Sequence, residues 1–181
     1  MKKIVLALVC AVMSLGAFAQ VSYGVKAGFD MTNFVGSDVD HKMMPNYQVG
    51  LFVEKKFNDK FGIAPEAVFA AQGGKPNDVD FQVNYINVPV MLKYYATEDL
   101  AIDFGPQVGF NVYSKLEGVD MKDATKTVDF GLGLGGTYNL AENFFLQARY
   151  TMGLTDAFKS EGLIKNNAKN GNIQLSVGYR F

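Results

Sequence analysis

The side chains of this sequence that could do chemistry are charged residues set singly into long segments of alternating apolar residues. Because side chains of a β-strand point alternately to its two faces, these charges would lie on the face opposite the apolar side chains. Acids and bases gathered in a buried interior are expected to pair, since an unpaired buried charge is costly. The predicted interior charge cluster consists of Lys26, Glu54, Glu66, Lys93, Asp103, Asp129, Arg149 and Arg180.

Two functions would suit such a cluster. If the acids and bases pair tightly, they form a salt-bridged plug that closes the interior. If they are hydrated, they line a narrow gated pore and set its selectivity. The sequence favours the plug and leaves the narrow passive channel as the alternative. Within the cluster we expect Arg149 to be held by one or more of Glu66, Asp103 and Asp129.

A catalytic site is harder to find. His41 is the only histidine, and it lies in a polar segment with Ser37, Asp38 and Asp40. A serine hydrolase needs a fixed Ser–His pair, and no G-x-S-x-G elbow is present. The acids beside His41 have the spacing of no defined metal-binding loop. The sequence therefore predicts no enzyme, no metal site and no cofactor.

A glycine-rich stretch, Gly131 to Gly136, matches the dinucleotide-binding pattern G-x-G-x-x-G. That pattern binds phosphate where a strand leads into a helix, whose N-terminus meets the phosphate. Here Thr137 and Tyr138 continue a strand into a turn. We interpret the glycines as thinning the protein wall beside the inward charges, which leaves space for the long Arg149 side chain.

Eight alternating segments would position these residues. Each has roughly 10 to 15 residues, whereas soluble strands usually have about 5 or 6 and a tilted strand crossing a bilayer needs about 9 to 11. The lengths therefore favour the membrane. The predicted strands are Val21–Met31, Asn46–Phe57, Lys60–Gln72, Phe81–Tyr95, Leu100–Tyr113, Thr127–Tyr138, Phe144–Thr155 and Asn172–Phe181.

The two faces of these segments differ as a membrane barrel requires. One face carries bulky side chains such as Phe29, Leu51 and Phe104, and the other carries the charges among glycines. In a soluble lipocalin-like barrel the bulky face would point inward, but eight strands leave an interior just wide enough for side chains. The opposite arrangement, with the bulky side chains outside against lipid and the charges inside, fits the sequence better. We predict an all-β fold: an eight-stranded antiparallel up-and-down transmembrane β-barrel.

The connections support this prediction and its orientation. Short connections at Asn58–Asp59, Ala96–Asp99 and Asn139–Asn143 alternate with longer polar ones at 32–45, 73–80, 114–126 and 156–171. Outer-membrane barrels have short periplasmic turns and longer extracellular loops. We therefore expect the long loops to face the exterior, where an unidentified protein partner could bind them.

The two ends of the chain indicate export. Lys2 and Lys3 precede the apolar run Ile4–Leu15, and a small-x-small cleavage pattern ends at Ala19, so residues 1–19 are predicted to be a signal peptide cleaved before Gln20. The barrel domain would then be residues 20–181. Its last strand ends at Phe181. Bacterial outer-membrane barrels end in such an aromatic residue, which the barrel-assembly machinery recognises. We expect a protein of the cell outer membrane, with lipid as its surroundings.

The composition limits other functions. Cleavage would remove Cys10, the only cysteine, and with it any disulfide or thiol chemistry. Loss of Lys2 and Lys3 would reduce the 17 basic residues to 15 against 18 acidic ones, and no basic run is present that would bind nucleic acid. Three prolines, Pro65, Pro89 and Pro106, fall inside predicted strands, where each removes a ladder hydrogen bond; we expect local bulges there.

The segments around these prolines resemble a known family. Ile63–Phe69 and Tyr85–Tyr94 are similar to the third and fourth strands of the outer-membrane β-barrel domain family abundant in Bacteroidetes, often labelled porin-like or PorT-like. Tyr23–Gly28 and Gly105–Gly109 are similar to other parts of its pattern, and Asn87 stands where an acidic residue is more usual. The resemblance covers nearly all of the predicted mature chain. It implies the fold, and a link to secretion machinery for PorT-like members, but no activity.

Overall fold

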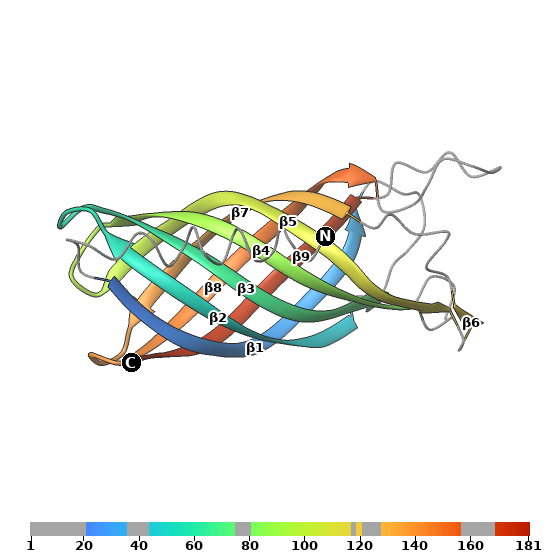
Figure 1. The fold of residues 1–181 in the computed structure, drawn as a ribbon, viewed down its shortest axis with the longest axis horizontal. Coiled ribbons are helices and arrows are strands. Elements are labelled where there is room, and N and C mark those ends of the chain that lie inside the picture. The colour runs from blue at the N-terminus through green and yellow to red at the C-terminus, as the bar shows by residue number, and fades with distance from the viewer. Residues whose placement is uncertain (1–20, 36–43, 75–80, 117–118, 121–127, 157–168) are drawn as a thin grey trace.

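The structure is a computed structural model, which describes residues 21–35, 44–74, 81–116, 119–120, 128–156 and 169–181. These residues form strands joined by short turns, and the strands run obliquely around a common axis (Figure 1). The strands are β1 Val21–Val35, β2 Met44–Lys56, β3 Phe61–Gly74, β4 Phe81–Tyr95, β5 Leu100–Leu116, β6 Val119–Asp120, β7 Val128–Asn139, β8 Phe144–Asp156 and β9 Lys169–Arg180.

Eight of these strands form a closed antiparallel barrel, which confirms the predicted fold. Each pairs with its neighbours along the chain, β5 pairs with β7, and the pairing of β1 with β9 closes the cylinder. The two-residue strand β6 pairs only with the end of β5, and it lies beyond the barrel proper (Figure 1). The strands β1 and β5 extend past their predicted ends because ladder pairing continues, as between Val35 and Lys169 and between Leu116 and Phe81.

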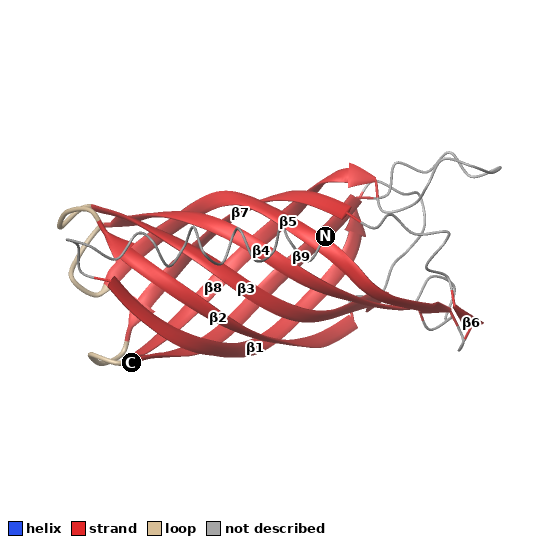
Figure 2. Ribbon diagram, in the orientation of Figure 1, coloured by secondary structure: helices blue, strands red, loops and turns tan. Residues whose placement is uncertain are grey.

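The three short connections are the same four-residue turn, at 57–60, 96–99 and 140–143. In each, the first turn residue donates its N–H over 2.9 Å to the carbonyl of the residue that starts the next strand, as from Phe57 to Phe61. This bond fixes the turn length at four, so the predicted lengths of two residues at Asn58–Asp59 and five at Asn139–Asn143 are wrong. All three turns lie at one end of the barrel, which we call the turn rim (Figure 2). The opposite end is the loop rim.

The C-terminus completes the wall at the turn rim. The N–H of Phe181 donates to the carbonyl of Tyr23 on β1 over 2.9 Å, and the N–H of Arg180 donates to Asn143 over 2.7 Å. The ring of Phe181 lies against those of Tyr23 and Tyr179, with centroids 5.6 and 5.4 Å apart. The last residues of the chain are therefore part of the closed barrel wall.

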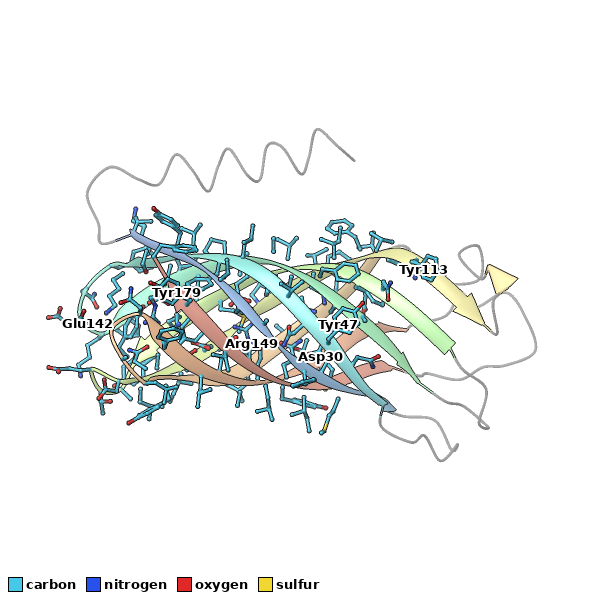
Figure 3. All side chains as sticks on the ribbon, turned by 90° about the horizontal axis from the view of Figure 1, so that it is seen from below. Asp30, Tyr47, Tyr113, Glu142, Arg149 and Tyr179 are labelled. Atoms are coloured by element: carbon cyan, nitrogen blue, oxygen red, sulfur yellow. The ribbon has the colours of Figure 1, made fainter. Side chains whose placement is uncertain are left out.

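The barrel has its apolar side chains outside and most of its polar ones inside, as predicted. Outward-pointing Phe29, Leu51 and Leu134 are 69, 62 and 58% exposed, and Figure 3 shows side chains projecting outward along the whole cylinder. The side chains buried in the interior are mostly polar or charged. Such a distribution would be unstable in water and suits a wall surrounded by lipid.

The prolines do not produce the bulges that we expected. Pro65 pairs with Val90, Pro89 with Gln107 and Pro106 with Leu132, and the register is the same on both sides of each proline. Residue pairs beside the prolines are missing from the strand pairing, because proline has no N–H to donate to the neighbouring strand. The register shift that does occur between β4 and β5 lies at Asn84 and Tyr85. Neighbouring bridges therefore hold the strands in register where a proline interrupts the ladder.

The outward face yields a prediction about lipid exposure. Leu134→Arg, in the middle of the wall on β7, should reduce the free energy of unfolding by about 2 to 4 kcal/mol, because it places a cation at the centre of the bilayer. The matched control is Leu140→Arg, because Leu140 lies in the exposed turn at 140–143 and should lose at most about 1 kcal/mol near the interface. Urea unfolding in lipid vesicles measures both; equal losses would contradict the assignment of the lipid face.

Candidate functional site

The centre of the interior is occupied by Glu66, whose carboxylate is bound from two sides. Arg149 donates from Nη1 to Oε2 over 2.9 Å and from Nη2 to Oε1 over 2.8 Å, a bidentate pair. Lys26 donates from Nζ to Oε2 over 2.6 Å and to Oε1 of Gln147 over 2.9 Å. The side chains of Glu66, Arg149 and Lys26 are at most 3% exposed. Charge-assisted, bidentate bonds of this kind are the strong ones.

The Arg149–Glu66 pair crosses the lumen. Arg149 is on β8 and Glu66 is on β3, and three strands separate β3 from β8 in either direction around the barrel. The two side chains therefore start from opposite walls and meet between them. Figure 3 shows Arg149 within the cylinder, between Glu142 at the turn rim and Tyr113 toward the loop rim. The pair therefore bridges the interior from one wall to the other.

A second group of ion pairs lies nearer the turn rim, around Glu54. Lys93 donates to Oε2 of Glu54 over 2.8 Å, and the hydroxyl of Tyr95 donates to Oε1 over 2.9 Å. The Nη2 of Arg180 lies 3.6 Å from the same carboxylate. The Arg180 side chain is 14% exposed, so its pairing with Glu54 is weaker than those deeper inside.

Asp103 on β5 connects the two groups. Its Oδ1 lies 3.7 Å from Lys93 and its Oδ2 lies 3.9 Å from Arg149. The same Oδ2 accepts hydrogen bonds from Thr137 over 2.7 Å and from Gln147 over 3.1 Å. We call the connected set the charge network. It has at least one member on each of the eight barrel strands: Lys26, Glu54, Glu66, Lys93, Tyr95, Asp103, Thr137, Gln147, Arg149 and Arg180.

The structure unites seven of the eight predicted cluster residues in this network. Arg149 is held by Glu66, and by Asp103 at longer range, as expected. Asp129 is the exception, because it lies near the loop-rim end of β7, paired in register with Gly109 and only half-buried. Gly133 lies beside Arg149 as predicted: a Cβ there would come within 3.4 Å of the arginine Cδ.

Sequence reasoning missed the aromatic side chains that fill the interior next to the network. Phe52 on β2 and Phe145 on β8 are buried, and their rings meet edge to face with centroids 5.3 Å apart. Each ring covers a glycine opposite it in the register, Phe52 over Gly24 and Phe145 over Gly178. An inward-facing aromatic residue opposite a glycine was the available signal. These rings occupy the interior between the charge network and the turn rim.

The described residues contain no group of three or more His, Cys, Asp or Glu side chains that could hold a metal ion. Ser37, Asp38, Asp40 and His41, which sequence analysis weighed as a hydrolase or metal site, lie outside the described residues. The described ranges also contain no helix long and apolar enough to cross a membrane.

The charge network predicts a large cost for removing one partner. Arg149→Met keeps an unbranched apolar stem but removes the guanidinium, so that Lys26 is the one hydrogen-bond partner left to the Glu66 carboxylate among the described residues. We expect a loss of about 3 to 5 kcal/mol, as for a broken dry ion pair. Arg180→Met should lose clearly less, because Glu54 retains Lys93 and Tyr95. Equilibrium unfolding in detergent compares the two. A loss below about 1 kcal/mol for Arg149→Met would indicate a water-filled lumen.

The barrel is similar in fold to solved structures of small outer-membrane proteins. Neisserial surface protein A (NspA) superposes with a TM-score of 0.58 at 15% identity, covering 89% of this chain and 97% of NspA. Ail, the attachment invasion locus protein of Yersinia pestis, superposes with a TM-score of 0.54 at 17% identity in its complex with the heparin analogue sucrose octasulfate, covering 91% of this chain and 100% of Ail. In a phospholipid bilayer nanodisc, Ail gives 0.52 at 19% identity, covering 90 and 100%.

At these identities the structural likeness concerns the fold alone. No curated protein sequence matches the chain. The family comparison is more specific: the model of the outer membrane protein beta-barrel domain matches residues 5–181. The chain is therefore a member of the outer membrane protein beta-barrel domain family, and its localisation is the outer membrane.

Proposed function

We propose that this protein is a non-enzymatic, non-conducting outer-membrane barrel that acts in envelope integrity or in interactions through its long loops. The observation that carries the proposal is the Arg149–Glu66 pair, which joins opposite walls and leaves both side chains at most 3% exposed. A barrel closed in this way offers its surroundings only its outer wall and its two rims. Function would therefore lie in the loops and in the wall.

Two further layers support closure of the lumen. Toward the turn rim, the Phe52 and Phe145 rings and the Glu54 ion pairs occupy the interior. Beside the central pair, Met91 is fully buried, and a Cβ on Gly133 would come within 3.2 Å of its Cε. Apolar and ionic groups thus fill the same cross-sections, which favours a plug over the alternative of a narrow passive channel.

The long loops are the part of the chain that this proposal assigns to a partner. The connections between β1 and β2, β3 and β4, β5 and β7, and β8 and β9 all leave the loop rim, and most of their residues lie outside the described ranges. Ail, a barrel of similar fold, is named for attachment and was crystallised with a heparin analogue. By the same architecture, we propose that these loops face the cell exterior and bind a partner there.

Processing and lineage belong to the same proposal. We propose that residues 1–19 are a signal peptide removed between Ala19 and Gln20, which the mass of the protein purified from outer membranes would test. We also propose that the chain belongs to the branch of the family that is abundant in Bacteroidetes, on the strength of the Pro65 and Pro89 segments. A link to secretion machinery, which PorT-like members imply, would follow only from a partner found at the loops.

Conductance tests the proposed closure. Wild-type protein in planar bilayers should give no current steps above those of empty bilayers, because the charge network blocks the lumen. Glu66→Ser combined with Arg149→Ser removes the pair that crosses the lumen and should introduce small conductance steps. Asp59→Ser combined with Lys60→Ser removes an acid and a base from an exposed turn instead and should remain silent. Steady current steps from the wild type would contradict the plug and support the channel.

A second experiment tests the proposed recognition of Phe181 by the assembly machinery. Phe181→Leu keeps an apolar side chain at the rim but removes the aromatic ring. We expect much less folded barrel in the outer membrane of cells, yet nearly normal refolding of the purified chain in detergent. Tyr23→Leu removes the ring that packs against Phe181 from β1 and serves as the control. Equal losses for both variants in cells and in detergent would show that the ring matters only for packing.

A further inference from the structure

The interior toward the loop rim contains a buried acid that the charge network does not use. Asp30 on β1 is 0% exposed, and neither oxygen of its carboxylate has a hydrogen-bond partner within the described residues. In Figure 3 it lies closer to the loop rim than Arg149 does. Burying an ionised carboxylate without a partner is costly. Lys26 of the charge network acts on this carboxyl group electrostatically but donates no hydrogen bond to it. A bound cation or a proton would stabilise the group further.

Residues near Asp30 in the barrel wall also carry buried side-chain oxygens that have no hydrogen-bond partner among the described residues. Gln48 on β2 and Asn172 on β9 are 2 and 6% exposed, and each has an amide oxygen without a hydrogen-bond partner in the described part of the chain. Thr151 on β8 is 5% exposed, and its hydroxyl is likewise unpartnered there. Four side chains therefore present five oxygen atoms without partners, which is unusual for a protein interior.

The strand register places these four side chains in one arc. Gln48 faces Gly28, two residues from Asp30 on β1, so Gln48 and Asp30 are diagonal neighbours. Asn172 faces Thr32, two residues from Asp30 on the other side, so it is diagonal to Asp30 across β1 and β9. Asn172 also faces Thr151 directly. Diagonal neighbours lie about 7 to 8 Å apart and direct ones about 5 Å, so the four side chains form an unbroken series of neighbours from β2 to β8.

The adjoining part of the wall carries small residues at inward positions. Gly131 on β7 pairs with Gly153 on β8 in the register, and both are buried. Next to them on β5, Gly109 is covered by the side chains of Asn87 and Tyr85. Asp129 also lies at this end of the barrel, half-buried on β7. Among the described inward-facing side chains between the charge network and the loop rim, the charged ones are Asp30 and Asp129, both acidic. The local field therefore favours a cation.

We propose that Asp30, Gln48, Thr151 and Asn172 bind a single hard cation of the Ca²⁺ type at the loop-rim end of the lumen. Ca²⁺ takes six to eight oxygen ligands in flexible geometry, and it accepts carboxylate, amide and hydroxyl oxygens together with water. Mg²⁺ requires a tighter octahedron and keeps more of its water. One carboxylate with neutral oxygens makes a weak site, like those of extracellular modules, with a Kd of roughly 10⁻⁴ to 10⁻³ M. The charge network forms the floor of the site, so the ion would enter from the loop rim.

Calorimetric titration of the full-length folded barrel in detergent tests this site. After treatment with a chelator, the wild type should bind one Ca²⁺ with a Kd of roughly 10⁻⁴ to 10⁻³ M, bind Mg²⁺ more weakly, and show no saturable response to Na⁺. Asp30→Asn keeps the shape of the side chain but removes its charge, and it should weaken Ca²⁺ binding at least about tenfold, the effect of losing roughly 1.4 kcal/mol. Asp99→Asn, in an exposed turn at the opposite rim, should bind as the wild type does.

A second variant keeps the test decisive if Asp30→Asn folds poorly. Asn172→Leu removes a neutral amide group and no charge, and it should weaken Ca²⁺ binding several-fold. Heat-dependent gel mobility verifies that each variant is folded. Ca²⁺ should also raise the unfolding temperature of the wild type more than that of either variant. The proposal is overturned if the wild type shows no saturable Ca²⁺ binding, or if Asp30→Asn binds with unchanged affinity, because the ion would then be held by acids elsewhere in the chain.

Discussion

The structure depends on one constraint: charged groups in an interior too narrow for bulk water must find partners on other strands. Arg149 and Glu66 start from opposite walls, so neither can be satisfied before the barrel has closed. Lys26, Lys93 and Asp103 connect further strands to this pair until all eight are involved. Buried ion pairs contribute little net stability compared with apolar packing, but they disfavour arrangements in which they are broken. A one-residue slip would turn any of these charges toward lipid.

The same constraint accounts for the distribution of glycine. The interior of an eight-stranded barrel is just wide enough for its side chains. A long inward side chain therefore fits only where the adjacent inward position is a glycine. Gly133 and Gly135 lie against Arg149, while Gly24 and Gly178 lie beneath the rings of Phe52 and Phe145. The G-x-G-x-x-G stretch of β7 is thus the wall that faces the central arginine. Its resemblance to a nucleotide-binding loop follows from the spacing of inward positions on a strand.

Much of this could be predicted from the sequence, because period-2 alternation is a local property. It places Leu51 outside and Glu54 inside without reference to any other strand, and the lengths of the segments indicate a bilayer. What alternation cannot provide is the partner across the lumen. Glu66, Asp103 and Asp129 are equivalent in the sequence, and only their heights on tilted strands show that Arg149 meets the first two. The four-residue length was missed in two of the three turns, since it depends on a backbone hydrogen bond that residue spacing alone does not show.

The interior is asymmetric along the axis, and this asymmetry determines where chemistry can occur. Toward the turn rim, aromatic rings and ion pairs leave few polar atoms without partners, apart from Arg180 Nε at the rim itself. Beyond the central pair toward the loop rim, the buried side chains are neutral amides and hydroxyls, with Asp30 among them and unpaired within the described residues. In the plug that we propose, the charge network is the floor of an oxygen-rich upper interior that opens toward the long loops. A ligand of this upper interior would enter from the loop rim, so the loops and the upper interior would act as one site.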